Sequence, residues 1–306
     1  MLTAAKESRR LRDALTRAGT VAAVTAPLWL SCTALPTDPL LQPRPSADPA
    51  LHYTVHVERM PADTVHVTLE ISRWEHGDSV RLISPPMYAD NPMLLQSRPN
   101  VHRIRLRDES GAAVAFTTDS MQFGLYRSMV IAAAIDLPLT LEYDVTFGYE
   151  TWWGLPLPHV DERGGYLQGT YLFMAPYDGT PELAHIWRRP WNMRLEYALD
   201  ETVSLRGDPV DGADIPNVYA LLFSTSALGG EIVISGSGGG QDFVFVNIQD
   251  TTYGDSVLRA IESGFTEIMA DVTGLFGGFD EHPMTVIMGV NKGGGLEGMY
   301  AFSIYN

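Results

Sequence analysis

Cysteine is almost absent from this sequence, which has one cysteine among 306 residues. A single cysteine excludes an internal disulfide framework and a cysteine-rich metal site. Basic residues are also scarce: 21 Lys and Arg stand against 37 Asp and Glu, and the formal net charge is −16. Because the phosphate backbone of nucleic acid is bound by clustered Lys and Arg, this acidity predicts that nucleic acid is not a partner.

Three catalytic motifs are missing as well. The sequence contains no HExxH, which would place two zinc-binding histidines and a general-base glutamate on one helical face. It contains neither a GxSxG nucleophile elbow nor a GxxxxGK phosphate loop. We therefore predict no catalytic residue and no metal ligand within the chain.

The first residues have the composition of an export signal. A positive segment over residues 1–17 is followed by the apolar run AGTVAAVTAPLWLSC, which ends at Cys32. This layout predicts a signal peptide over residues 1–32 and resembles a bacterial lipoprotein signal, in which the cysteine is lipidated. The Pro-rich stretch 33–50 predicts an extended tether. We expect an exported protein of the bacterial cell envelope, in the periplasm or outer membrane, with a lipid anchor at Cys32. The alternatives are a signal that is simply cleaved and a buried cysteine in an ordinary helix.

Alternating apolar residues dominate the next part of the chain. Within residues 51–71 they recur at every second position on both sides of a turn at 60–63. Residues 139–147 alternate apolar and polar side chains, which predicts a strand with one buried and one solvent-facing side. Similar runs occur at 101–107, 113–118, 166–174 and 193–199. We predict an antiparallel β-sandwich domain over residues 51–215.

From about residue 218 the sequence predicts an α+β unit. Residues 255–276 place apolar side chains at helical spacing, with Asp255 or Ser256 as the cap and glycines at 277–278 as the end. The segments EIVIS and DFVFVNI before this helix, and MTVIMGV after it, predict strands. Because few elements precede Asn306, we expect this unit to be the incomplete beginning of a larger domain.

Two further sequence patterns are compatible with a ligand-binding site, and each can also be interpreted without a ligand. His52, His56 and His66 lie on the polar sides of paired strands, where they either ligate a metal or occupy solvent-facing positions. No fixed ligand spacing supports the metal. The segment SGSGGGQ at 235–241 lies between two predicted strands with no helix after it. We therefore predict a hairpin loop there rather than a phosphate-binding loop.

The last feature is GGGLEG, residues 293–298, directly before a strand-like run. The glycines allow another backbone to approach closely, and Glu297 leads into what we expect to be an edge strand. An exposed edge pairs with an extended peptide, and a carboxylate accepts hydrogen bonds from the ammonium group of that peptide. The alternative interpretation is a glycine-rich turn before a last strand.

Three segments in the order NVYALLFSTSALGG (217–230), TGLFGGFDEHPMTVIMGV (273–290) and KGGGLEGMYAFS (292–303) resemble the glycyl aminopeptidase family of zinc metallopeptidases. Proteins of that family have an N-terminal β domain, a thermolysin-like catalytic domain and commonly a PDZ domain. The matching positions are Tyr219, Leu222, Ser224, Gly229 or Gly230, Leu275, Phe276, Gly277, Pro283, Gly294, Gly295, Leu296 and Glu297. Gly298 departs from the family motif, which has histidine there, and Pro283 comes later than the family's turn proline.

The resemblance implies that residues 218–306 are the truncated N-terminal part of a thermolysin-like catalytic domain. The zinc ligands and the general base would then lie beyond Asn306, so zinc is expected for the full-length family member and not for this chain. Gly294, Gly295 and Glu297 would bind the free N-terminus of a peptide substrate. The alternative is a non-catalytic β-sandwich envelope lipoprotein that binds a peptide, a glycan or a partner protein.

Overall fold

The structure is a computed structural model. It describes residues 48–75, 79–83, 100–121, 126–131, 137–147, 159–177, 189–208, 212–248, 253–276, 284–288 and 299–301. The predicted signal peptide with Cys32, most of the tether, and the segment with Gly294, Gly295 and Glu297 lie outside these described residues. Strands predominate in the described residues, which confirms the mainly β class predicted from the sequence.

The largest sheet has six strands in the order β13-β11-β1-β2-β7-β4. Its members are β1 (Leu51–Val57), β2 (Thr64–Ile71), β4 (Asn100–Asp108), β7 (Leu139–Thr146), β11 (Pro190–Leu199) and β13 (Ala213–Asn217). Neighbouring strands are antiparallel, as predicted, except that β1 and β11 run parallel. The fully antiparallel prediction is wrong at this pair. Parallel neighbours need a long crossover, and everything from β2 to β10 intervenes between these two strands.

One face of this sheet forms the main hydrophobic core. Burial alternates with exposure along β1, β2 and β7, as the apolar pattern predicts. Each buried Val, Leu or Ile side chain contributes about 1.5–3 kcal/mol relative to an exposed one. The same cluster of buried residues includes Val218, Leu221 and Leu228, which lie past the predicted end of the β-sandwich domain at residue 215. The position of that boundary stays a prediction.

Three smaller sheets accompany the large one in the described part of the chain. One contains β10 (Ala175–Pro176), β3 (Arg81–Ile83), β6 (Tyr126–Ile131) and β5 (Phe116–Met121). The second contains β12 (Leu205–Asp208), β14 (Thr225–Gly229), β9 (Gly164–Gln168) and β8 (His159–Val160). The third contains β15 (Glu231–Gly238), β16 (Gln241–Asn247), β17 (Met284–Met288) and β18 (Met299–Ala301). The two packed layers of a closed sandwich stay a prediction.

Three helices occur within the described ranges: α2 (Gly169–Leu172), α4 (Val218–Phe223) and α5 (Asp255–Phe276). Asn217 caps α4, because its side chain accepts a hydrogen bond from the backbone N–H of Ala220 at 2.8 Å. The helix α5 ends at Phe276, directly before the glycines predicted to end it, and it begins at Asp255, which the sequence predicts as a possible cap rather than the first helical residue. Within the described ranges, no helix combines the length and apolar character that crossing a membrane requires.

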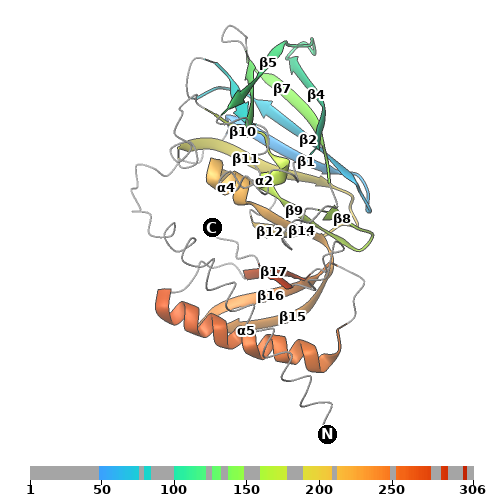
Figure 1. Cartoon of the computed structure of the whole chain (residues 1–306), viewed down its shortest axis with the longest axis vertical. Helices are drawn as coiled ribbons and strands as arrows, with labels where there is room; N and C mark the ends of the chain where they lie inside the picture. The colour runs from blue at the N-terminus through green and yellow to red at the C-terminus, as the bar shows by residue number, and fades with distance from the viewer. Residues whose placement is uncertain are drawn as a thin grey trace. The chain divides into compact units, whose positions relative to one another are not determined.

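The helix α5 lies along the sheet that contains β15 and β16 (Figure 1). Phe265 of α5 packs edge-to-face on Phe243 and Phe245 of β16, with ring centres 4.9 Å apart in both pairs. The hairpin predicted for SGSGGGQ is confirmed, since β15 and β16 are antiparallel and meet at Gly239 and Gly240. Both glycines have positive φ angles, 62° and 87°, which other residues rarely adopt.

Candidate functional site

The strand that follows Glu297 lies at the edge of its sheet. β18 is last in the order β15-β16-β17-β18, and among the described strands it pairs with β17 alone. Within the described residues, β18 is therefore an edge strand, as the sequence predicts. Gly294, Gly295 and Glu297 belong to the connection from β17 to β18, outside the described residues, and Glu297 precedes Met299 by two positions. An extended peptide can add to the second edge of β18 as a further strand.

The sheet that carries β18 packs against the sheet of β9 and β14. Val246 and Ile248, at and just after the end of β16, form a cluster with Tyr166 and Ala227. Gly164 permits this approach, because a Cβ atom at its position would lie 2.8 Å from the Cβ atom of Ile248. The strand β9 is therefore held directly against the sheet to which β18 belongs.

Two buried polar side chains lie where β9 leads into α2. Gln168 and Thr170 are 4% and 2% exposed. Within the described part of the chain, Oε1 of Gln168 and Oγ1 of Thr170 have no hydrogen-bond partner. A buried polar group without a partner costs about 1–3 kcal/mol, and such groups are rare in native structures. Both side chains are therefore candidates for contact with a polar ligand.

Reasoning from the sequence missed these two residues. The available signal is that Gln168 and Thr170 flank Gly169 within the otherwise apolar stretch YLQGTYLFMAP. Gly169 brings α2 against α4: its N–H donates to the carbonyl of Ser224 at 2.9 Å, and a Cβ atom there would collide with the carbonyl oxygen of Leu221. The glycine thus fixes the close approach that buries its two polar neighbours.

Two buried tyrosines of the six-stranded sheet hold the end of α2. The Tyr143 hydroxyl donates to the carbonyl of Leu172 at 2.9 Å and accepts from the N–H of Met174 at 3.0 Å. The Tyr53 hydroxyl donates to the carbonyl of Met174 at 2.8 Å. Burial raises the pKa of both tyrosines above the usual value, so both stay protonated donors. The turn with Gln168 and Thr170 is therefore fixed without a ligand.

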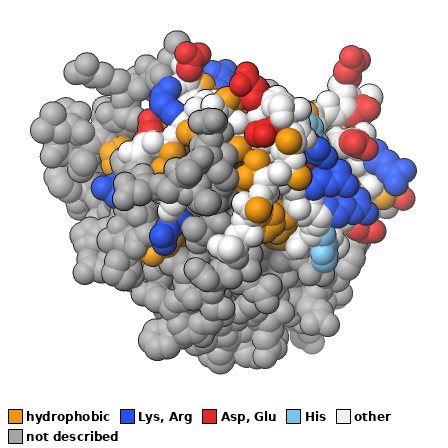
Figure 2. All heavy atoms as spheres, turned by 90° about the horizontal axis from the view of Figure 1, so that it is seen from above, with side chains coloured by type: hydrophobic (Ala, Val, Ile, Leu, Met, Phe, Trp, Pro, Cys, Tyr) orange, Lys and Arg blue, Asp and Glu red, His pale blue; other side chains and the backbone are white. Residues whose placement is uncertain are grey.

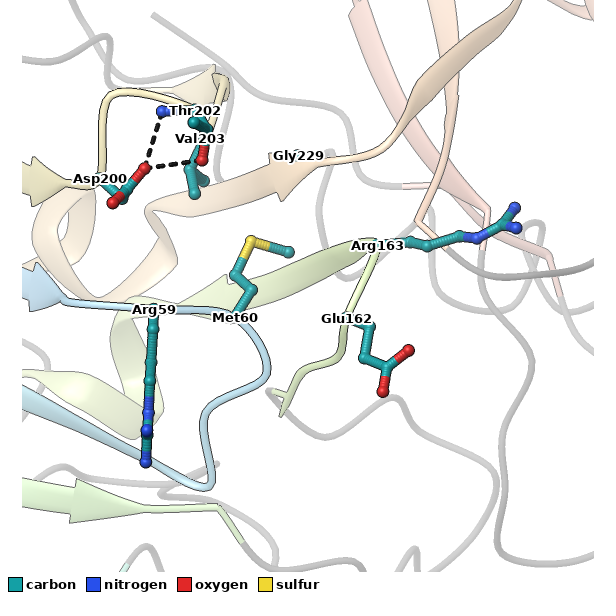
Figure 3. A pocket seen from close by; sticks show the side chains of 8 residues that line it. All are labelled: Arg59, Met60, Glu162, Arg163, Asp200, Thr202, Val203 and Gly229. Atoms are coloured by element: carbon teal, nitrogen blue, oxygen red, sulfur yellow. Dashed lines mark hydrogen bonds between the residues drawn. The ribbon is translucent and has the colours of Figure 1, made fainter.

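A cavity of about 330 Å³ lies among the turns that follow β1, β8 and β11. It is lined by Arg59, Met60, Glu162, Arg163, Asp200, Thr202, Val203 and Gly229. The hydroxyl and backbone N–H of Thr202 donate to the carboxylate of Asp200 and lower its pKa. The side chains of Arg59 and Arg163 extend in different directions rather than toward one point (Figure 3). Because binding sites rely on convergent polar groups, we assign no ligand to this cavity.

The three-ligand catalytic zinc site that the resemblance implies for a full-length family member does not lie within the described residues. Among them, no three His, Cys, Asp or Glu side chains are grouped as metal ligands. The structure also separates the three histidines considered from the sequence. His56 and His66 lie next to each other, whereas His52 lies beside Glu70 and Glu196.

No family model matches the chain, and no curated protein matches it. Among solved structures, the chain is similar to an aminopeptidase N family protein from Idiomarina loihiensis, with a TM-score of 0.53 and 15% identity, over 77% of this chain and 38% of that one. It is also similar to leukotriene A4 hydrolase from Saccharomyces cerevisiae (TM-score 0.40, 13% identity, 78% of this chain and 37% of that one). A third similarity is to a variant of the M1 zinc metallopeptidase from Deinococcus radiodurans bound to a Tyr-Ser-Ala substrate (TM-score 0.38, 14% identity, 78% and 56% coverage).

The first similarity shows a shared fold, that of the β-rich part of an aminopeptidase N family protein. The other two TM-scores are too low to add to it. The chain spans 38% of the length of the Idiomarina loihiensis protein. The likeness extends to the fold alone, and membership of the glycyl aminopeptidase family stays a prediction.

Proposed function

We propose that this chain is the substrate-binding, N-terminal part of a zinc metallo-aminopeptidase that removes N-terminal residues from peptides. The observation that carries the proposal is the fold, which the chain shares over 77% of its length with an aminopeptidase N family protein. In this proposal residues 51–215 are the β-sandwich domain, and residues 218–306 begin a thermolysin-like catalytic domain. The lipoprotein-like signal supports an envelope location, with the anchor at Cys32.

Peptide binding in this proposal uses two features of the chain. The open edge of β18 offers backbone groups to an extended peptide, and Glu297, two residues earlier, accepts hydrogen bonds from the peptide's ammonium group. Gly294 and Gly295 let the peptide backbone come close. Gln168 and Thr170 stay candidates for contact with a polar ligand, and no observation places their buried oxygen atoms at this edge.

The zinc ligands and the general base of the whole enzyme belong, in this proposal, to sequence beyond residue 306. We therefore expect the chain by itself to bind peptides without hydrolysing them. Reading the coding sequence after codon 306 is the simplest check, and an HExxH motif in frame is the expected finding. Chelator-sensitive release of amino acids by residues 1–306 alone contradicts this division of roles.

A titration of two matched peptides tests the binding role. The full chain is titrated calorimetrically with a short peptide that has a free N-terminus and with the same peptide N-acetylated. Acetylation is expected to weaken binding by about tenfold or more, because a hydrogen bond to a charged group contributes about 1.5–3 kcal/mol. Glu297→Gln is expected to remove the difference between the two peptides. Equal affinity for both peptides in the unsubstituted chain overturns the proposal and favours the non-catalytic envelope lipoprotein.

A further inference from the structure

The outer face of the six-stranded sheet carries a row of polar side chains that the proposed function does not use. His102, Asp144, His66 and His56 stand in register across β4, β7, β2 and β1. Figure 2 shows histidine side chains at the surface among side chains of both charges. The His66 side chain is 39% exposed, so a small ion reaches it from solvent.

A hydrogen bond determines which nitrogen of His66 carries the proton. Its Nδ1 lies 2.8 Å from Oδ1 of Asp144. An ionised carboxylate only accepts hydrogen bonds, so Nδ1 carries the hydrogen and Nε2 of the neutral ring has the lone pair. Carboxylates orient metal-ligating histidines in this same way.

Asp144 is also bound by Arg103. The Nη1 atom of Arg103 lies 3.2 Å from Oδ2 of Asp144. The register of β4 against β7 shifts between His102 and Arg105, and Arg103, inside this irregularity, has a φ angle of 51°. Few residues other than glycine adopt such an angle. The irregular backbone thus places a guanidinium on Asp144, and both carboxylate oxygens are occupied before any ligand binds.

His56 is placed to act as a second ligand. Its ring centre lies 5.4 Å from that of His66. With Zn–N distances of about 2.0–2.1 Å and tetrahedral angles, two imidazole rings on one zinc ion have centres roughly 5 Å apart. Nε2 of His56 lies 3.1 Å from Oγ1 of Thr68, and the tautomer in which Nε2 donates to this oxygen has its lone pair on Nδ1.

We propose that His56 and His66 form a surface site for a divalent transition-metal ion, zinc in the first place, with solvent completing the coordination. Asp144 is the positioning residue, since it acts through His66. A site with two protein ligands is consistent with the lack of a three-ligand group among the described residues. It is independent of the aminopeptidase proposal, because it involves neither Glu297 nor β18.

Zinc titration of the full chain tests the site. Isothermal titration with zinc chloride at pH 7.5 is expected to show one zinc ion bound per chain. His56→Ala and His66→Ala are each expected to abolish this zinc binding. Asp144→Asn keeps an acceptor for Nδ1 but loses the charge, and it is expected to weaken zinc binding by about 10- to 100-fold. Circular dichroism establishes that each variant is folded.

His52→Ala is the matched control, because His52 lies on the same strand and face as His56 but beside Glu70 and Glu196. It is expected to leave the zinc affinity unchanged. The double variant His56→Ala/His66→Ala measures any zinc held elsewhere in the chain. Absence of binding, equal affinity in the unsubstituted chain and the double variant, or an equal loss in His52→Ala overturns the proposal.

Discussion

A buried hydroxyl stabilises or destabilises a fold according to its partner, and both kinds occur beside Gly169. Oγ of Ser224 donates to the carbonyl of Leu221 at 2.7 Å, so its burial is compensated. Oγ1 of Thr170 has no such partner in the described part of the chain. A buried hydroxyl without a hydrogen-bond partner lowers the stability of the fold, so folding does not explain its presence, whereas contact with a ligand does.

This contrast leads to a test at the two positions. Thr170→Val keeps the shape of the side chain and removes the uncompensated hydroxyl, so it is expected to leave the free energy of unfolding unchanged or to raise it by up to about 1 kcal/mol. The same variant is expected to weaken peptide binding. Ser224→Ala is expected to lower the free energy of unfolding by about 1 kcal/mol. Urea unfolding and peptide titration measure the two effects, and a Thr170→Val variant that loses stability contradicts a ligand-binding role.

At the level of elements, the sequence predicts well wherever one side of an element is buried. The strands β1, β2 and β7 and the helix α5 follow directly from apolar periods of two and about 3.6. The parallel pairing of β1 with β11 could not be read in this way, because periodicity reports which side is buried and not which strand is the neighbour. The burial of Gln168 could not be predicted from the sequence for a related reason. It results from the contact of α2 with α4, which are far apart in sequence.

The hairpin between β15 and β16 offers a second test. Gly239 and Gly240 both have positive φ, so alanine at either position is expected to cost about 1–2 kcal/mol. At Gly239 the added Cβ atom also meets Oγ1 and Cβ of the buried Thr273 on α5, whereas at Gly240 it meets nothing within 4 Å. Overpacking of this kind costs about a further 1–3 kcal/mol. Urea midpoints are expected to fall more for Gly239→Ala than for Gly240→Ala; equal effects contradict a close contact between this hairpin and α5.

For the whole molecule, the described core divides into clusters of unequal size. The main cluster joins the six-stranded sheet to α4 and to parts of β9, α2 and β14. The cluster under α5 is much smaller and consists of Ile234, Phe243, Phe245, Ile261, Met269 and Val286. On α5 itself, Ile268 and Leu275 are 48% and 77% exposed. Within the described residues, the apolar side chains of α5 are therefore covered only in part.

The difference in size between the two clusters predicts which part of the molecule unfolds locally more often. Amides of α5 are expected to exchange with solvent at least about tenfold faster than those of β1, β2 and β7, because opening the smaller cluster exposes less apolar surface. Native-state hydrogen exchange at low denaturant measures both sets within one sample, so the strands serve as the internal reference. If the chain is the non-catalytic lipoprotein, α5 belongs to a finished fold and opens together with the large sheet. Equal protection of α5 and the strands therefore counts against the aminopeptidase proposal, whereas faster exchange confined to residues after about 250 supports it.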